Sequence, residues 1–211
     1  MSVIVTELTK ELSSQALALV CDEFSVHSPL HRALDIAGIE YLAYLSPQWR
    51  NYAFGDQSIA LMALNVTTNE LIGCLIAIPY DSQLVHFDKT PTRLRPITAL
   101  LRQLEQDYER LRSRQSAGAL LVDIAVVKDD LKGNGYYKQL RSAVQQKARE
   151  AGFGCVLGEL SSVVTQHVCV QKMGHKVLAE IKYADFMFEG AYPFAVIEEP
   201  ASIQLVGCSL I

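Results

Sequence analysis

The sequence predicts an α/β fold in one domain, residues 1–211, in which strands alternate with helices. Short runs of branched apolar residues, typical of strands, alternate with longer stretches whose apolar residues recur at helical spacing. Between residues 119 and 148 such a run passes through a glycine-containing turn directly into a helical pattern. Half of the residues are apolar, which is enough for a full core.

The first half of the chain predicts three strands and several helices. Two apolar runs flank a turn-like Thr-Thr-Asn-Glu stretch, which indicates an antiparallel hairpin. Prolines then mark an irregular connection that leads to a helical repeat of apolar residues. In chain order we expect a strand at 3–8, a helix at 12–24, two helical pieces within 30–45, strands at 59–64 and 71–78, and an inserted helix around 97–114.

The second half continues the alternation. Its first strand, 119–127, is followed by apolar residues four apart, which predict a helix that begins just after Gly135. The remaining elements are expected to be a strand at 154–160, a helix at 162–173, and strands at 176–183 and 203–210.

The glycine-bearing turn between strand and helix is an expected anion site. The first N–H groups of a helix lack partners and carry the positive end of its dipole, so they stabilise a bound phosphate. Gly133 and Gly135 allow close backbone approach and positive φ. Asn134-Gly135 alone would also suit a hairpin turn, but the helical pattern that follows favours a phosphate loop. The Walker and dinucleotide-binding patterns are both absent.

Composition excludes several classes of function. A net charge of -4 provides no basic surface for nucleic acid. The five cysteines are odd in number and contain no CxxC, so neither a disulfide framework nor a metal site is indicated. No apolar run has the length of a membrane span, and the N-terminus has no signal-peptide pattern. We therefore expect a soluble, cytoplasmic protein without a metal, a nucleic-acid partner or a membrane partner. The residues do not indicate its oligomeric state.

The loop resembles the acetyl-CoA loop of the GCN5-related N-acetyltransferases (GNAT superfamily), in which Arg/Gln-x-x-Gly-x-Gly/Ala follows the fourth strand. Gly133 and Gly135 match the two small positions, whereas Asp130 stands where the family has arginine or glutamine. Three later motifs are similar to those of invertebrate arylalkylamine (dopamine-type) N-acetyltransferases: Ser161-Ser162-x-x-Thr165, Lys172-Met173-Gly174-His175 and Tyr183-Ala184-Asp185. The resemblance implies the GNAT acyl-CoA N-acyltransferase fold, with a mixed, mostly antiparallel central sheet flanked by helices.

The resemblance also implies that acetyl-CoA is the cosubstrate and that its arm lies between two splayed strands. Carried over to this chain, it assigns the pantetheine arm and the oxyanion to the strand before the loop, and the pyrophosphate to the loop. The implied cofactor-binding residues are Ile124, Ala125, Val126, Lys132, Gly133, Asn134, Gly135 and Tyr136.

Candidate catalytic residues follow from the same alignment. Ser161 and Thr165 stand where two hydroxyls help to stabilise or protonate the sulfur, although a serine at a helix start also serves as an N-cap. Ser28 occupies the place of the glutamate that is the family's usual base. His27 and His31 flank it, and either could accept the proton of the amine. Glu159 is a further candidate, but we favour its interpretation as an ionised carboxylate exposed at a strand end.

The expected activity is acetyl-CoA-dependent N-acetyl transfer to the primary amine of a small, arylalkyl-type molecule. Two alternatives remain open: an acyl-CoA-binding protein with impaired catalysis, and an acetyltransferase whose acceptor is a polyamine or a polypeptide amine. An aromatic amine pocket is expected from Phe24, Tyr41, Tyr44, Phe186 and Tyr192.

Overall fold

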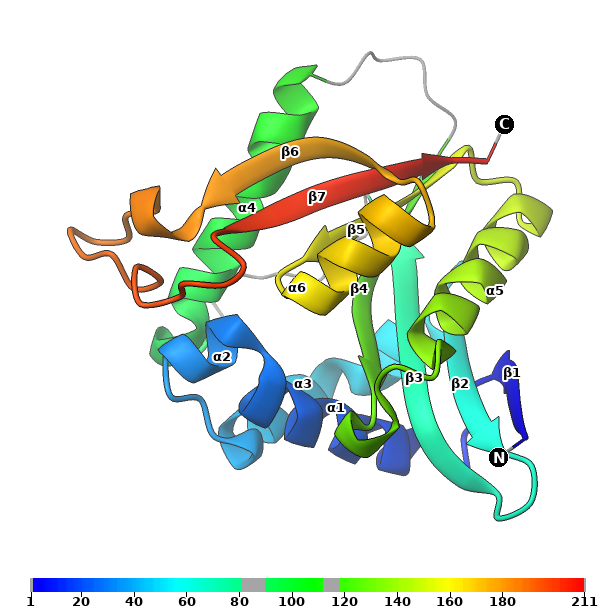
Figure 1. The fold of residues 1–211 in the computed structure, drawn as a ribbon. Helices are drawn as coiled ribbons and strands as arrows, with labels where there is room; N and C mark the ends of the chain where they lie inside the picture. The colour runs from blue at the N-terminus through cyan, green and yellow to red at the C-terminus, as the bar shows by residue number, and fades with distance from the viewer. Residues whose placement is uncertain (1, 81–89, 112–117, 211) are drawn as a thin grey trace.

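The computed structural model describes residues 2–80, 90–111 and 118–210. Within these ranges the strands form one seven-stranded sheet in the order β1-β2-β3-β4-β5-β7-β6 (Figure 1). Neighbouring strands are antiparallel except for β4 and β5, which are parallel. The predicted mixed, mostly antiparallel sheet with flanking helices is therefore confirmed.

The N-terminal half contains the expected elements. Residues 59–65 and 70–79 form the predicted antiparallel hairpin. Pro96 is the second residue of the inserted helix, a position where its missing N–H is tolerated. The elements are β1 (Val3–Glu7), α1 (Ser13–His27), α2 (Pro29–Ala33), α3 (Gly38–Phe54), β2 (Ile59–Asn65), β3 (Glu70–Pro79), η3 (Thr92–Leu94) and α4 (Arg95–Leu111).

The second half follows the expected order as well. The last strand, β7, lies between β5 and β6, so the C-terminal segment completes the sheet internally. The elements are β4 (Ala119–Val127), η4 (Asp129–Leu131), α5 (Tyr136–Glu150), β5 (Cys155–Leu160), α6 (Val163–Gln166), η5 (His167–Lys172), β6 (Lys176–Lys182), η6 (Tyr183–Asp185) and β7 (Ser202–Ser209).

Some boundaries differ from the sequence predictions. Helix α3 continues nine residues beyond the expected end at 45 and passes through Pro47, because Trp49, Tyr52 and Ala53 are buried against the core. The helix expected at 162–173 is α-helical only to Gln166 and then becomes π-helical through η5. The inserted helix is described to Leu111, and the expected residues 112–114 lie outside the described ranges.

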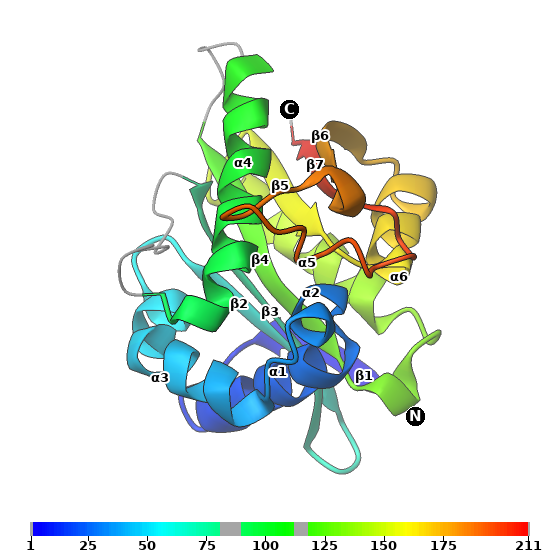
Figure 2. The same ribbon diagram turned by 90° about the vertical axis from the view of Figure 1, so that its left-hand side faces the viewer.

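Helices cover both faces of the sheet. Helices α1 and α3 pack on β2, β3 and β4, while α4 packs on β6 and β7. On the opposite face, Leu140, Val144 and Ala148 of α5 meet the other side of the same sheet. Figure 2 shows α4 running above α1, α2 and α3 on the side away from α5. In the described part of the chain, no helix has both the length and the apolar character needed to cross a bilayer.

Strand β4 contains a bulge at the centre of the sheet. Ile76 of β3 faces Ile124, and Ala77 faces Val122, which leaves Asp123 as the extra residue on β4. On its other side β4 pairs with β5 only from Ala119 to Val122. Beyond that point the two parallel strands separate, and the sheet is split on the side where both strands end.

Candidate active site

A cavity of about 160 Å³ lies where β4 and β5 separate. Its wall combines residues from helices on both faces of the sheet, so the cavity passes through the split. The lining residues include Phe24, Ser28, His31, Tyr41, Tyr44, Tyr52, Asp123, Ala125, Tyr137, Arg141, Glu159, Ser161 and Thr165.

Aromatic rings form one side of the cavity. His31 packs edge-on against Phe24, with ring centroids 5.2 Å apart, and against Tyr41 at 4.6 Å. The Tyr41 ring stacks on Phe24 at 5.7 Å and on Tyr44 at 6.3 Å. Such a wall suits the ring of an aromatic ligand or an organic cation.

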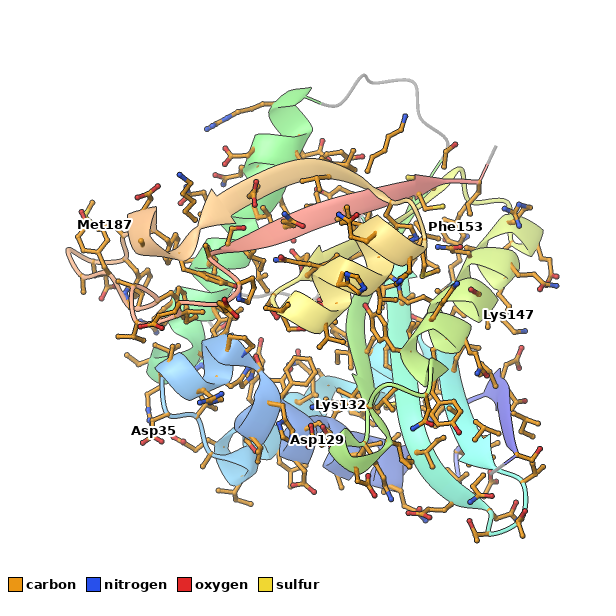
Figure 3. The ribbon with its side chains drawn as sticks, in the orientation of Figure 1. Asp35, Asp129, Lys132, Lys147, Phe153 and Met187 are labelled. Carbon is orange, nitrogen blue, oxygen red and sulfur yellow. The ribbon has the colours of Figure 1, made fainter. Side chains whose placement is uncertain are left out.

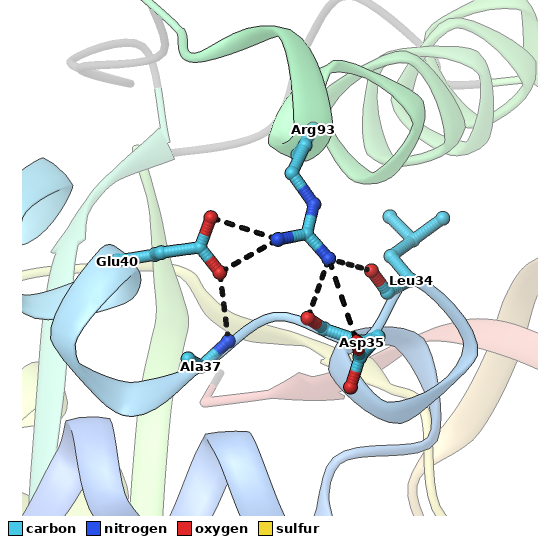
Figure 4. A network of polar contacts seen from close by, with 5 residues as sticks. All are labelled: Leu34, Asp35, Ala37, Glu40 and Arg93. Carbon is cyan, nitrogen blue, oxygen red and sulfur yellow. Dashed lines mark hydrogen bonds and ion pairs between the residues drawn. The ribbon is translucent and has the colours of Figure 1, made fainter.

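A polar network holds this aromatic wall in place from outside (Figure 4). The Arg93 guanidinium, from the segment that leads into α4, donates to both Glu40 oxygens and to the Leu34 and Asp35 carbonyls. Glu40 also accepts from the Ala37 N–H at 3.0 Å and so caps α3. The turn between α2 and α3 is therefore fixed to η3, directly before α4, and α4 lines the cavity from the other direction.

Two carboxyl groups face the cavity at the start of the split. Asp123 accepts a hydrogen bond from the Tyr52 hydroxyl, which lowers its pKa, but burial has the larger effect and raises it. Burial also raises the pKa of Glu159, and the Asp123 charge and the Glu105 carboxyl raise it further. Glu159 is therefore only partly exposed and lies in the cavity wall, which corrects its interpretation as an exposed carboxylate at a strand end.

Ser28 and His31 form a hydrogen-bonded pair beside the rings. His31 is only 3% exposed, and its Nδ1 lies 3.1 Å from the Ser28 hydroxyl. Its Nε2 is buried and has no hydrogen-bond partner among the described residues. Burial lowers the pKa of His31 to about 4, so the ring is neutral at physiological pH.

Ser161 and Thr165 both line the cavity from the α5 and α6 side. Ser162, between them, is the N-cap of α6, and its hydroxyl accepts from the Thr165 N–H at 3.2 Å. The Thr165 hydroxyl lies 3.0 Å from the Ser162 hydroxyl, so Thr165 also takes part in the cap. The expected N-cap is thus Ser162, and Ser161 is left beside the cavity.

Arg141 is a buried cation on the α5 side of the split. It is 1% exposed, and within the described ranges its Nε and one terminal nitrogen have no hydrogen-bond partner. The guanidinium lies against Gly158, where a Cβ atom would stand only 2.7 Å from it. Gly158 therefore provides the space for the charge next to the last paired residues of β4 and β5.

The glycine loop lies between β4 and the N-terminus of α5. Gly133 and Gly135 have φ values of 85° and 79°, as the loop prediction allowed, and Gly135 provides no side-chain cap to α5. Lys132 forms an ion pair with Asp129, which Figure 3 shows at the loop, and Lys128 pairs with Glu70. Asp130 is exposed. Both loop lysines are therefore partly neutralised by carboxylates of the protein.

The structure separates the predicted site residues into two groups. Ser28, Ala125, Ser161 and Thr165 line the cavity. His27 does not line it: its ring lies 3.6 Å from Asp129 and 3.9 Å from Glu23, beside the glycine loop.

The predicted aromatic pocket is also divided. Phe24, Tyr41 and Tyr44 line the cavity, but Phe186 is buried in the core against Phe194, and Tyr192 is 54% exposed. Sequence reasoning missed Asp123 and Arg141. An aspartate within an otherwise apolar strand was the available signal for Asp123.

No protein-family model and no curated protein sequence matches the chain. Several solved structures share its architecture over nearly their whole length. The C-terminal condensation domain of Ebony, in complex with beta-alanyl-dopamine, gives a TM-score of 0.86 at 15% identity, covering 99% of each chain.

Arylalkylamine N-acetyltransferase 2 from Aedes aegypti gives a TM-score of 0.79 at 15% identity, covering 100% of both chains. The polyamine N-acetyltransferase of Drosophila melanogaster gives 0.77 at 19% identity, covering 99% of this chain and 100% of that one. The chain thus has the fold of the GCN5-related N-acetyltransferases, and the resemblance in fold to the insect arylalkylamine enzymes is confirmed.

Because Asp123 and Glu159 are partly buried in the cavity wall, we predict that the free energy of unfolding falls as pH rises above the ordinary carboxyl range. The pKa of each is raised in the native protein, whereas in the unfolded chain it is about 4. Below that pH both states are protonated. Above it the unfolded chain releases protons that the native protein retains, so the free energy of unfolding decreases until the native pKa is passed.

Urea unfolding at successive pH values measures this dependence. Each group contributes a slope of at most about 1.4 kcal/mol per pH unit. The double variant Asp123→Asn, Glu159→Gln should flatten the curve, whereas Asp107→Asn, on the exposed face of α4, should not. Equal slopes in the wild type and the double variant would contradict the assigned pKa directions.

Proposed function

We propose that this protein transfers an acetyl group from acetyl-CoA to the primary amine of a small molecule that carries an aromatic ring. The observation that carries the proposal is the cavity at the split between β4 and β5. It is lined by aromatic rings on one face of the sheet and by residues of α5 and α6 on the other. A thioester and an amine that enter from opposite faces would meet at the split.

The backbone of β4 provides the binding site proposed for the acetyl donor, acetyl-CoA. Beyond Val122 the edge of β4 that faces β5 is free of strand pairing in the described part of the chain. Its N–H and C=O groups can bond the amides of a pantetheine arm as an added strand would. In this proposal Ile124, Ala125 and Val126 bind the arm and the oxyanion, and Lys132 to Tyr136 bind the pyrophosphate through helix N–H groups.

The aromatic side chains of the cavity provide the binding site proposed for the acetyl acceptor, the amine. Phe24, Tyr41 and Tyr44 provide an apolar wall, while Ser28 and the neutral His31 provide polar groups within it. Support also comes from the fold neighbours, which include an arylalkylamine N-acetyltransferase and a domain that holds beta-alanyl-dopamine. In this proposal Ser161 and Thr165 help to protonate the departing sulfur.

A thiol-release assay tests the proposal. Acetyl-CoA is supplied with tyramine, dopamine, tryptamine, serotonin, spermidine, agmatine or a short peptide, and binding of acetyl-CoA is measured beside it by calorimetry. We expect turnover with at least one arylalkylamine. Tight binding of acetyl-CoA without thiol release on any amine would instead indicate a binding protein, and turnover only on spermidine or agmatine would indicate a polyamine acceptor.

Replacement of Gly133 by valine should weaken the affinity for CoA at least about tenfold, since a side chain there blocks the approach of the pyrophosphate to the backbone. Gly152→Val is the matched control. Gly152 also has a φ of 85° and also has no atom within 4 Å of an added Cβ, but it lies at the other end of α5. Equal losses of affinity in both variants would remove the loop from the binding site.

The double variant Ser161→Ala, Thr165→Ala should lower kcat about a hundredfold while acetyl-CoA affinity stays nearly constant. Ser162→Ala is the control, because it removes the α6 cap at a cost of about 1 kcal/mol but leaves the two cavity hydroxyls in place. An equal loss of kcat in the control would return Ser161 and Thr165 to a capping role.

A further inference from the structure

On both β4 and β5, the first residue beyond the end of their mutual pairing is an acid. Parallel pairing ends with Val122 opposite Gly158, and the next residues are Asp123 and Glu159. Leu121 and Leu157, two positions earlier on each strand, face α4 in the same core cluster. Glu159 points to that same face because side chains alternate along β5. Asp123 is the bulged residue of β4 and reaches the same face, since it accepts from Tyr52 of α3; both acids line the cavity.

Other polar groups face this pair from every element around it. Tyr52 of α3 donates to Asp123, and the Glu105 carboxyl of α4 meets Glu159. The Oε1 atom of Glu159 is buried and has no partner in the described part of the chain. The other titratable side chains that line the same cavity are His31 of α2, Tyr41 and Tyr44 of α3, and Tyr137 and Arg141 of α5.

A second observation at the same cavity points to a ligand that donates hydrogen bonds. His31, on the wall opposite the sheet, is 3% exposed and presents an unpartnered Nε2. In the tautomer in which Nδ1 donates to the Ser28 hydroxyl, Nε2 of His31 is an acceptor, and the Glu159 carboxylate oxygen without a donor is another. A primary amine provides the N–H groups that these acceptors lack.

The pair is better suited than the histidine to take a proton. A base is most effective when its pKa lies near the working pH. Burial lowers the pKa of His31 to about 4, which makes the ring a weak base. Burial instead raises the pKa of both carboxyls, and the Asp123 charge and the Glu105 carboxyl raise that of Glu159 further, so that a proton is retained above the ordinary carboxyl range.

We propose that Asp123 and Glu159 together form the proton acceptor of the transfer reaction. This inference rests on the proposed acetyltransferase function. The bound ammonium gives one proton to the pair, and the neutral nitrogen attacks the thioester carbonyl to form the C–N bond. When the C–S bond breaks, the second proton leaves nitrogen and ends on the departing sulfur, giving amide and free thiol. The pair then releases its proton to solvent.

The test is the pH dependence of kcat at saturating amine, since kcat reports ionisations in the bound complex. We expect the wild-type kcat to rise with pH, and the midpoint of this rising limb of the profile to lie above the ordinary carboxyl range. Glu159→Gln should lower kcat about a hundredfold or more. Asp123→Asn should shift the limb downwards by about one pH unit or more, because it removes the charge that raises the pKa of Glu159. Asp107→Asn should change neither.

Acetyl-CoA affinity and thermal melting, measured on every variant, show that the binding site is intact. A limb that stays in place in Asp123→Asn and moves in His31→Gln would overturn the inference. The inference would also be overturned if the Asp123 and Glu159 variants lost activity only on spermidine and agmatine and kept the wild-type pH profile of kcat on a monoamine. That result would mean that the two carboxyls bind the second cation of a polyamine.

The wild type alone also tests the inference. A kcat that is constant from about pH 5 to pH 9 would contradict it even if a variant fails to fold. Absence of wild-type turnover on every amine would overturn the proposed function itself, which separates the two failures.

Discussion

The candidate active site depends on the end of hydrogen bonding between β4 and β5, which in the described part of the chain stops after Val122 and Gly158. A buried strand edge needs partners for its N–H and C=O groups, so the free edge of β4 is an open position in the sheet. The bulge at Asp123 marks the point of divergence. Helices on both faces close around the gap and turn it into a cavity that connects them.

Charge is distributed unequally across the split. Asp123 and Glu159 lie on the face of α3 and α4, while Arg141 lies on the face of α5 against Gly158. Removing charged groups from water is costly. Tyr52 donates to Asp123, but Oε1 of Glu159 and two guanidinium nitrogens of Arg141 have no hydrogen-bond partner in the described part of the chain. Their retention at one place is understandable if they act on a ligand. In the acetyl transfer proposed for this cavity, proton loss from the amine occurs on one face and the thioester arrives from the other.

The sequence predicts the fold well because local patterns determine it. Branched runs, helical spacing and the Gly133-Asn134-Gly135 turn place nearly every element within a few residues. The site is predicted less completely, since it depends on long-range contacts. The burial of Glu159 results from packing against α4, and the separation of His27 from His31 results from the turn at Ser28 that begins α2. The spacing of apolar residues in the sequence predicts neither the burial of Glu159 nor the separation of the two histidines.

Amide chemical shifts of ¹⁵N-labelled protein during titration with acetyl-CoA test whether the thioester binds in the split between β4 and β5, because they report its position along the chain. We expect the largest shifts in residues 124–126 of β4, in the loop 132–136, and around Ser161 to Thr165 on the opposite side of the split. Saturable binding with shifts confined to other parts of the sheet, or no binding at millimolar acetyl-CoA, would contradict this expectation.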